Sequence, residues 1–195
     1  MAHGVFCFYE HIFEGFISTV QTTDVDFYVP DAKRIETKGN VIDALKGLDF
    51  DLVRDTLTAK SRFISPDNFE IEFLANLTKD GAATIRLGNA GIYAETLPYV
   101  NIFSGSYITV DFEGVVVKVA SPASFCLQKL LIWDRRSPLK QAKDLDAVNN
   151  VLIMIRASRK SREDFYDLFD SLPRSWAKKI QRTAQENDIS FPDRI

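Results

Sequence analysis

The change in the pattern of apolar residues near Pro122 restricts the fold of this chain more than any other feature of its sequence. Upstream, short apolar runs alternate with turn residues. YITVDF and VVVKVA on either side of Glu113-Gly114 are typical and predict a β-hairpin. Downstream, SPASFCLQKLLIWDRR begins with a Ser-Pro helix start and has a broad apolar face, and three more helical segments follow. We therefore predict an α/β (α+β) protein, with a small mixed sheet and flanking helices over residues 1–120 and a helical lobe over residues 121–195.

The first part of the chain contains further candidate elements. TTDVDFYVP is expected to form a strand that ends at Pro30, and RFISPD and FEIEFLAN are expected to form two strands joined by a turn at residues 65–68. ATIRLG is another candidate strand. Residues 36–47 have the apolar spacing of an amphipathic helix, and FDLVRDTL is expected to add one or two helical turns. The N-terminal run HGVFCFYEHIF is short and apolar, so periodicity leaves helix and buried strand open.

Charge and cysteine content restrict the cellular compartment and the kinds of partner that we expect for the chain. The net charge of −3 and the pI near 5.5 argue against a broad electrostatic grip on nucleic acid, while leaving room for a local basic patch. Both cysteines lie in apolar runs without metal-ligand spacing, which favours a reduced, cytoplasmic protein. The N-terminus lacks the basic start of a signal peptide, and no apolar run approaches the ~20 residues of a membrane span, so we expect no membrane partner.

Asp24 and Asp26 are the first candidate functional residues. Side chains two positions apart in a strand point to the same face, so these two carboxylates share one face while Val25 and Phe27 share the other. Two ionised carboxylates about 7 Å apart repel each other and lose hydration unless a cation lies between them. Mg²⁺ is the expected cation, because it prefers hard oxygen ligands and keeps positions open for water and phosphate. The alternative is that the motif lies on the solvent-exposed face of an edge strand.

A metal site of this kind needs a third carboxylate from a neighbouring element. FEIEFLAN offers Glu70 and Glu72, and Glu72 is better centred in the apolar run, whereas Glu70 lies nearer the turn. Two strands that carry these acids match the architecture of two-metal phosphoryl or nucleotidyl transfer. A metal-dependent phosphohydrolase is a weaker alternative, because the chain has only two histidines and no further carboxylate cluster.

Several motifs in order give the chain a family resemblance. TTDVDFYV resembles the Thr-x-Asp-h-Asp-h strand of the nucleotidyltransferase-fold superfamily, in which h is an apolar residue. FEIEFL takes the place of its third-carboxylate strand, and VVVKVASPASFCLQKLLIWDRR followed by KQAKDLDAVNNVL resembles its helix, basic pair and following helix. Within this superfamily the chain more closely resembles bacterial nucleotidyltransferase-like proteins related in fold to the toxin of the AbiE abortive-infection systems. It spans roughly residues 3–155.

The resemblance assigns roles to individual residues. It implies that Asp24 and Asp26 bind the metal and that Glu72 is the third acid, which binds metal or activates the acceptor hydroxyl. It implies that Asp144 orients a basic cluster. The residues that it implies for nucleotide binding are Gly4, Thr23, Lys129, Arg135, Arg136 and Lys140, with Lys143 in the same cleft.

The implied activity is Mg²⁺-dependent transfer of a nucleoside monophosphate from a nucleoside triphosphate, such as ATP, to a hydroxyl acceptor on RNA, protein or a small molecule. One part of the family pattern is missing. These enzymes carry a Gly-Gly or Gly-Ser turn before the aspartate strand, whose helix holds the triphosphate, and here His3-Gly4 is the nearest remnant. The alternative is therefore a nucleotidyltransferase-like module of weak or no turnover. Such a module would sense a nucleotide or bind a partner such as an antitoxin in a toxin–antitoxin or phage-defence system.

Overall fold

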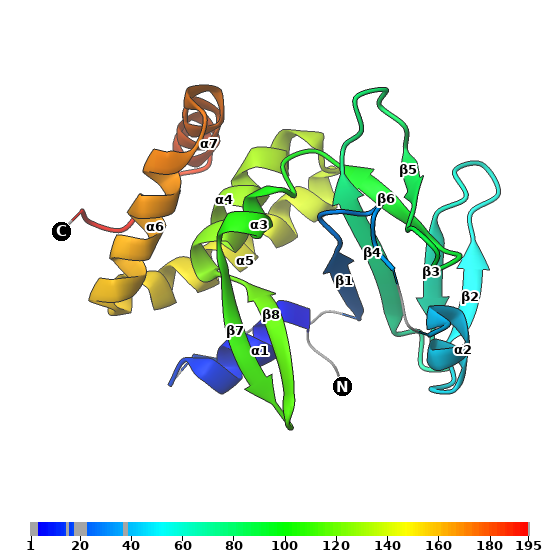
Figure 1. The fold of residues 1–195 in the computed structure, drawn as a ribbon. Coiled ribbons are helices and arrows are strands. Elements are labelled where there is room, and N and C mark those ends of the chain that lie inside the picture. The colour runs from blue at the N-terminus through cyan, green and yellow to red at the C-terminus, as the bar shows by residue number, and fades with distance from the viewer. Residues whose placement is uncertain (1–3, 15, 18–22, 37–38, 195) are drawn as a thin grey trace. The chain divides into compact units, whose positions relative to one another are not determined.

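The computed structural model describes residues 4–14, 16–17, 23–36 and 39–194, which fall into two compact units (Figure 1). The described residues within 1–4 and 21–101 form the first unit, and the described residues within 5–20 and 102–195 form the second. The main boundary thus lies near residue 101, whereas the predicted domain boundary at residue 120 follows the change in sequence pattern. The hairpin before Pro122 contacts the N-terminal helix of the second unit, where Phe8 packs edge-to-face on Phe112, which accounts for the difference. The division into a domain of residues 1–120 and a helical lobe of residues 121–195 stays a prediction.

The first unit is built on a six-stranded mixed sheet. Its strand order is β2-β3-β4-β6-β5, and β1 pairs with β4 outside this path. β4 runs parallel to β1 and to β6, whereas the pairs β2/β3, β3/β4 and β5/β6 are antiparallel. The strands are β1 (Asp24–Tyr28), β2 (Asp51–Arg54), β3 (Ser61–Ile64), β4 (Glu70–Asn76), β5 (Thr84–Arg86) and β6 (Tyr93–Leu97).

One face of this sheet packs into the apolar core of the first unit. Phe63 of β3 is fully buried, and its ring lies 6.2 Å from the ring of Phe73 on β4. The short helix α2 (Val41–Lys46) covers this core with Val41, Ile42 and Leu45. Because the strands alternate, the residues between these apolar positions form the opposite face of the sheet.

Gly88 is required where the chain crosses this core after β5. Its φ of +37° lies in the left-handed region, and a Cβ there would come within 1.8 Å of the backbone oxygen of Ile35. Glycine is the residue without a Cβ, so this close approach of two backbone segments accounts for its presence.

The second unit packs helices and a hairpin around α4. The side chain of Tyr9 on α1 is fully buried and donates a hydrogen bond to the backbone oxygen of Ala120 over 2.8 Å. Phe6 of α1 packs edge-to-face on Phe125 of α4, with ring centroids 5.3 Å apart. The elements are α1 (Gly4–Ile12), α3 (Ile102–Gly105), β7 (Tyr107–Phe112), β8 (Val115–Ala120), α4 (Pro122–Ile132), η1 (Trp133–Arg135), α5 (Pro138–Ala157), α6 (Arg159–Ser171) and α7 (Arg174–Glu186).

The C-terminal segment is tied to α6 of the same unit. Arg194 forms a two-pronged ion pair with Asp170, at 2.8 and 2.9 Å, and its guanidinium lies 4.2 Å from the ring centre of Tyr166. Phe191 packs on the rings of Phe165 and Phe169. In the part of the chain that the structure describes, no helix is long and apolar enough to cross a membrane.

The α+β class and most of the predicted elements are confirmed. They include the strand at Asp24–Tyr28, the antiparallel pair joined at residues 65–68, the hairpin and the helices that follow Pro122. The prediction of helical turns in FDLVRDTL is wrong, because Asp51–Arg54 pairs antiparallel with β3 and places Leu52 against the core. The N-terminal run is a helix, and β6 has no counterpart among the predicted strands because polar Glu95 and Thr96 interrupt its apolar pattern.

Candidate functional site: the acidic face of the first unit

Four carboxylates lie on one face of the β1/β4 strand pair. In the parallel pairing of β1 with β4, Asp24 lies opposite Glu70 and Asp26 lies opposite Glu72. Residues opposite each other on adjacent strands point to the same face, about 4.8 Å apart. On the reverse face, the rings of Phe27 and Phe73 stack with centroids 5.8 Å apart. The register thus brings together the three acids expected from the sequence, with Glu70 as a fourth.

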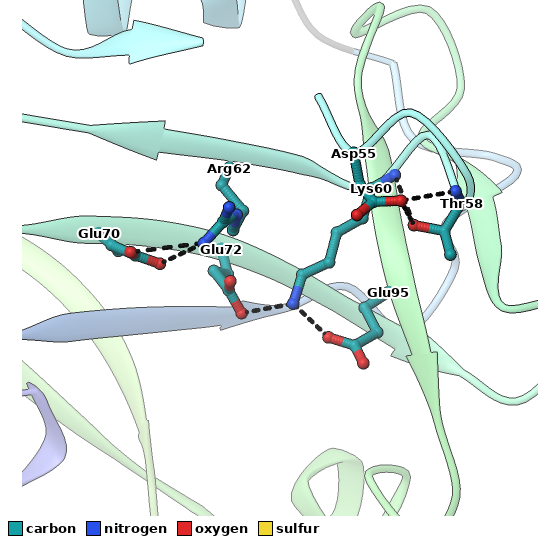
Figure 2. A network of polar contacts seen from close by, with 7 residues as sticks. All are labelled: Asp55, Thr58, Lys60, Arg62, Glu70, Glu72 and Glu95. Atoms are coloured by element: carbon teal, nitrogen blue, oxygen red, sulfur yellow. Dashed lines mark hydrogen bonds and ion pairs between the residues drawn. The ribbon is translucent and has the colours of Figure 1, made fainter. Parts of the chain in front are cut away.

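A lysine that the sequence reasoning missed reaches this acidic face. Figure 2 shows the Nζ of Lys60 between two carboxylates, and it donates to an oxygen of Glu72 at 2.9 Å and also to one of Glu95. Arg62 makes a longer contact of 3.3 Å with Glu70. Acids on β4 and β6 are thus matched by cations on and just before β3.

Electrostatics favour the charged state of Lys60. Burial alone would lower the pKa of this ammonium, but hydrogen bonds and charges from Glu95 and Glu72 outweigh it, and the pKa is raised above its ordinary value. The side chain retains 21% of its exposure, and that of Glu72 retains 18%. The ion pair is therefore shielded from water more than a typical surface pair.

The spacing of Lys60 and Arg62 in the sequence could have indicated that both lie on the acidic face. Lys60 and Arg62 are two positions apart and flank Ser61, directly before the buried Phe63, so in a strand they share the face opposite to Phe63. The pairing of β3 with β4 sets Arg62 opposite Glu72. Glu95 belongs to the strand absent from the predicted elements, which hid its position.

The donor chemistry of this face fits Mg²⁺. Asp24, Asp26 and Glu72 offer carboxylate oxygens alone, the ligands that this hard cation prefers. As arranged, the residues described by the structure hold no group of three acidic, histidine or cysteine side chains poised around a single ion. Glu72 is turned to Lys60 instead. The residues fit the metal in kind, while the third acid is engaged by a lysine.

The basic residues implied by the family resemblance lie in the second unit. Asp144 of α5 is buried and accepts hydrogen bonds from Lys129 Nζ at 2.8 Å and from Arg136 Nε at 3.0 Å. The expected link between this aspartate and a basic cluster is therefore present as direct contacts. Arg135 ends η1, and Lys140 is exposed in the first turn of α5.

The remaining expected site residues lie near the start of the chain. Gly4 is the first residue of α1, and Thr23 is exposed directly before β1. Thr23 is tied to the acidic strands, because its backbone oxygen accepts a hydrogen bond from Glu70 N at 2.8 Å. His3 and Thr22 lie outside the described residues. The nucleotide-binding roles of Gly4, Thr23 and the basic residues stay predictions.

Comparison with known families identifies the protein family of the chain. A family model described as "Nucleotidyltransferase" matches residues 6–171. The chain belongs to this nucleotidyltransferase family. Among solved structures, an antigenic nucleotidyltransferase-like protein from Paracoccidioides brasiliensis aligns with 84% of this chain and 78% of its own, at 14% identity and a TM-score of 0.37. No curated protein matches the sequence significantly.

Proposed function

We propose that this protein is a Mg²⁺-dependent nucleotidyltransferase that transfers a nucleoside monophosphate from a nucleoside triphosphate to a hydroxyl acceptor. The observation that carries the proposal is the register of β1 on β4, which sets Asp26 beside Glu72 in a member of a nucleotidyltransferase family. When bound, Mg²⁺ supplies charge neutralisation at the triphosphate and activation of the attacking oxygen.

The chain's own residues would divide the work as follows. Asp24 and Asp26 bind and orient the cation from a single strand, on the face opposite to the apolar core. In the reaction the acceptor oxygen bonds to the α-phosphorus, the bond from that phosphorus to the bridging oxygen breaks, and pyrophosphate leaves. The hydroxyl proton passes to a carboxylate oxygen of the acidic face, for which Glu72 is the candidate.

A second candidate function is a nucleotidyltransferase-like module that binds a nucleotide or a protein partner with little or no turnover. The ion pair of Glu72 with Lys60 favours it, because the third acid is then engaged by a protein cation. The residues before Asp24 also contain no Gly-Gly or Gly-Ser pair. This proposal includes a relationship to AbiE-type toxins and an antitoxin as the protein partner. It also includes a location in the bacterial cytoplasm.

The experiment that tests the function is a calorimetric titration of MgATP and MgGTP, with pyrophosphate release measured in parallel. The variant Asp24→Ala/Asp26→Ala should lose Mg²⁺-dependent nucleotide binding. The control Asp67→Ala/Asp80→Ala removes the same charge from exposed turns of the same unit and should bind as the wild type does. With RNA and protein added as acceptors, pyrophosphate release by the wild type supports the enzyme, and binding without release supports the second candidate. A folded wild type that binds neither nucleotide refutes the enzyme and the nucleotide-binding form of the second candidate, and leaves a module that binds a protein partner.

A further inference from the structure

Lys60 is the feature of the acidic face that the family assignment does not explain. Its ammonium lies between Glu72 on β4 and Glu95 on β6, two strands that run side by side, and it donates to both carboxylates. Arg62, the next cation on the same face, is bound less closely, since its contact with Glu70 is 3.3 Å and both side chains are more exposed. The structure therefore distinguishes one tightly held cation from one loosely held cation.

The backbone that presents Lys60 is fixed by a capped turn between β2 and β3. The side chain of Asp55 accepts hydrogen bonds from the backbone N–H of Thr58 at 2.7 Å and from its hydroxyl at 2.9 Å (Figure 2). Those bonds, with one from Leu57, lower the pKa of Asp55. The backbone oxygen of Lys60 accepts from Asp55 N at 3.0 Å, and Thr84 Oγ1 donates to the backbone oxygen of Thr58 at 2.6 Å. The lysine thus starts from a constrained backbone.

A cation so placed competes with a metal ion at Glu72. Mg²⁺ binds carboxylate oxygens at about 2.1 Å, whereas the ammonium lies 2.9 Å from Glu72 Oε2. Two positive groups on one carboxylate repel each other, in a setting where water screens them only partly. Binding of a divalent ion at Oε2 of Glu72 would therefore require Lys60 to leave that oxygen.

We infer that Lys60 supplies, as a covalently attached cation, the positive charge that a second divalent ion would otherwise bring to Glu72, so that the acidic face takes one divalent ion, at Asp24 and Asp26. This inference rests on the proposed function. It makes Lys60 a positioning residue that holds the third acid in its orientation before any metal arrives. Glu95 completes the arrangement as the second acceptor for the ammonium.

The test counts Mn²⁺ ions bound per chain, by equilibrium dialysis and electron paramagnetic resonance, with Mn²⁺ alone as the probe. The wild type should bind one ion. Lys60→Gln should bind two, and the pair should give an exchange-coupled spectrum, because two-metal sites hold their ions about 3.5–4 Å apart. The matched control Arg62→Gln removes the same charge from the same face and should still bind one ion.

Each other outcome overturns the inference. A wild type that binds two Mn²⁺ ions would overturn the inference without any variant. A folded Lys60→Gln variant that still binds one ion would overturn the inference and leave the proposed function in place. The double variant Lys60→Gln/Glu95→Gln leaves no unpaired Glu95 and should also bind two ions, which keeps the test open if the single variant fails to fold. A wild type that binds neither Mn²⁺ nor MgATP would remove the proposed function together with the inference.

Discussion

Replacing Asp144 with alanine should destabilise the second unit by about 3 kcal/mol. The carboxylate is 5% exposed and accepts two charge-assisted hydrogen bonds, from Lys129 at 2.8 Å and Arg136 at 3.0 Å. Bonds to charged groups contribute about 1.5–3 kcal/mol each. The two cations are 22% and 32% exposed and regain part of their hydration when the acid is lost, so the lower end of that range applies to each bond.

The assay is urea or thermal unfolding followed by circular dichroism. For a chain of this size, 3 kcal/mol corresponds to a fall in Tm of roughly 6–12 °C. Asp134→Ala is a matched control, because Asp134 also meets a lysine, Lys179, at 2.8 Å, but its own side chain is 42% exposed. Exposed pairs contribute about 0–1 kcal/mol. If Asp144→Ala loses no more stability than Asp134→Ala, the reasoning from burial is refuted.

Three further predictions concern other parts of the molecule. The bond from Arg194 lowers the pKa of Asp170, so its stabilising contribution is present above the ordinary aspartate pKa and is lost as the pH falls through the lowered value. Carbon NMR titration should show the pKa rising in Arg194→Ala. Gly88→Ala should cost about 3 kcal/mol of unfolding free energy in urea, from left-handed strain and overlap with a backbone oxygen. Burial raises the pKa of the Cys126 thiol, so mass spectrometry should find it unmodified by iodoacetamide in native protein, even where the partly exposed Cys7 reacts, and modified after unfolding.

Local sequence patterns predicted the helices and strands whose turn, cap and apolar-spacing signals are strong and continuous. The aspartate strand ends before Pro30 as its composition indicates, and the hairpin turns at Glu113-Gly114, where both residues have positive φ. The helix after Pro122 starts with its Ser121 side chain accepting from Ser124 N at 3.1 Å. In each case the deciding interactions lie within a few residues, so that a local reading was sufficient.

The arrangement of the acidic face depends on pairings that no local pattern encodes. β1 and β4 are parallel strands separated by a long stretch of chain, and the sequence alone gave no register between them. Lys60 reaches Glu95 only because β6 continues beside β4, and β6 has a weak strand signal. The family resemblance supplied the expected roles of Asp24, Asp26 and Glu72, while the lysine between Glu72 and Glu95 emerged from the tertiary structure.

The alignment of the acids is held by groups that take no part in the proposed chemistry. Side chains in a strand repeat every two residues, so a shift of β1 by two positions would leave each carboxylate on its face. It would set Asp24 opposite Glu72 and move Asp26 beside Leu74. What opposes that shift is the far end of the strand, where the Tyr28 hydroxyl donates to Asn76 Oδ1 at 2.8 Å. The hydrogen bond of Tyr28 at the end of β1 therefore helps to fix the register that determines which acids lie opposite each other.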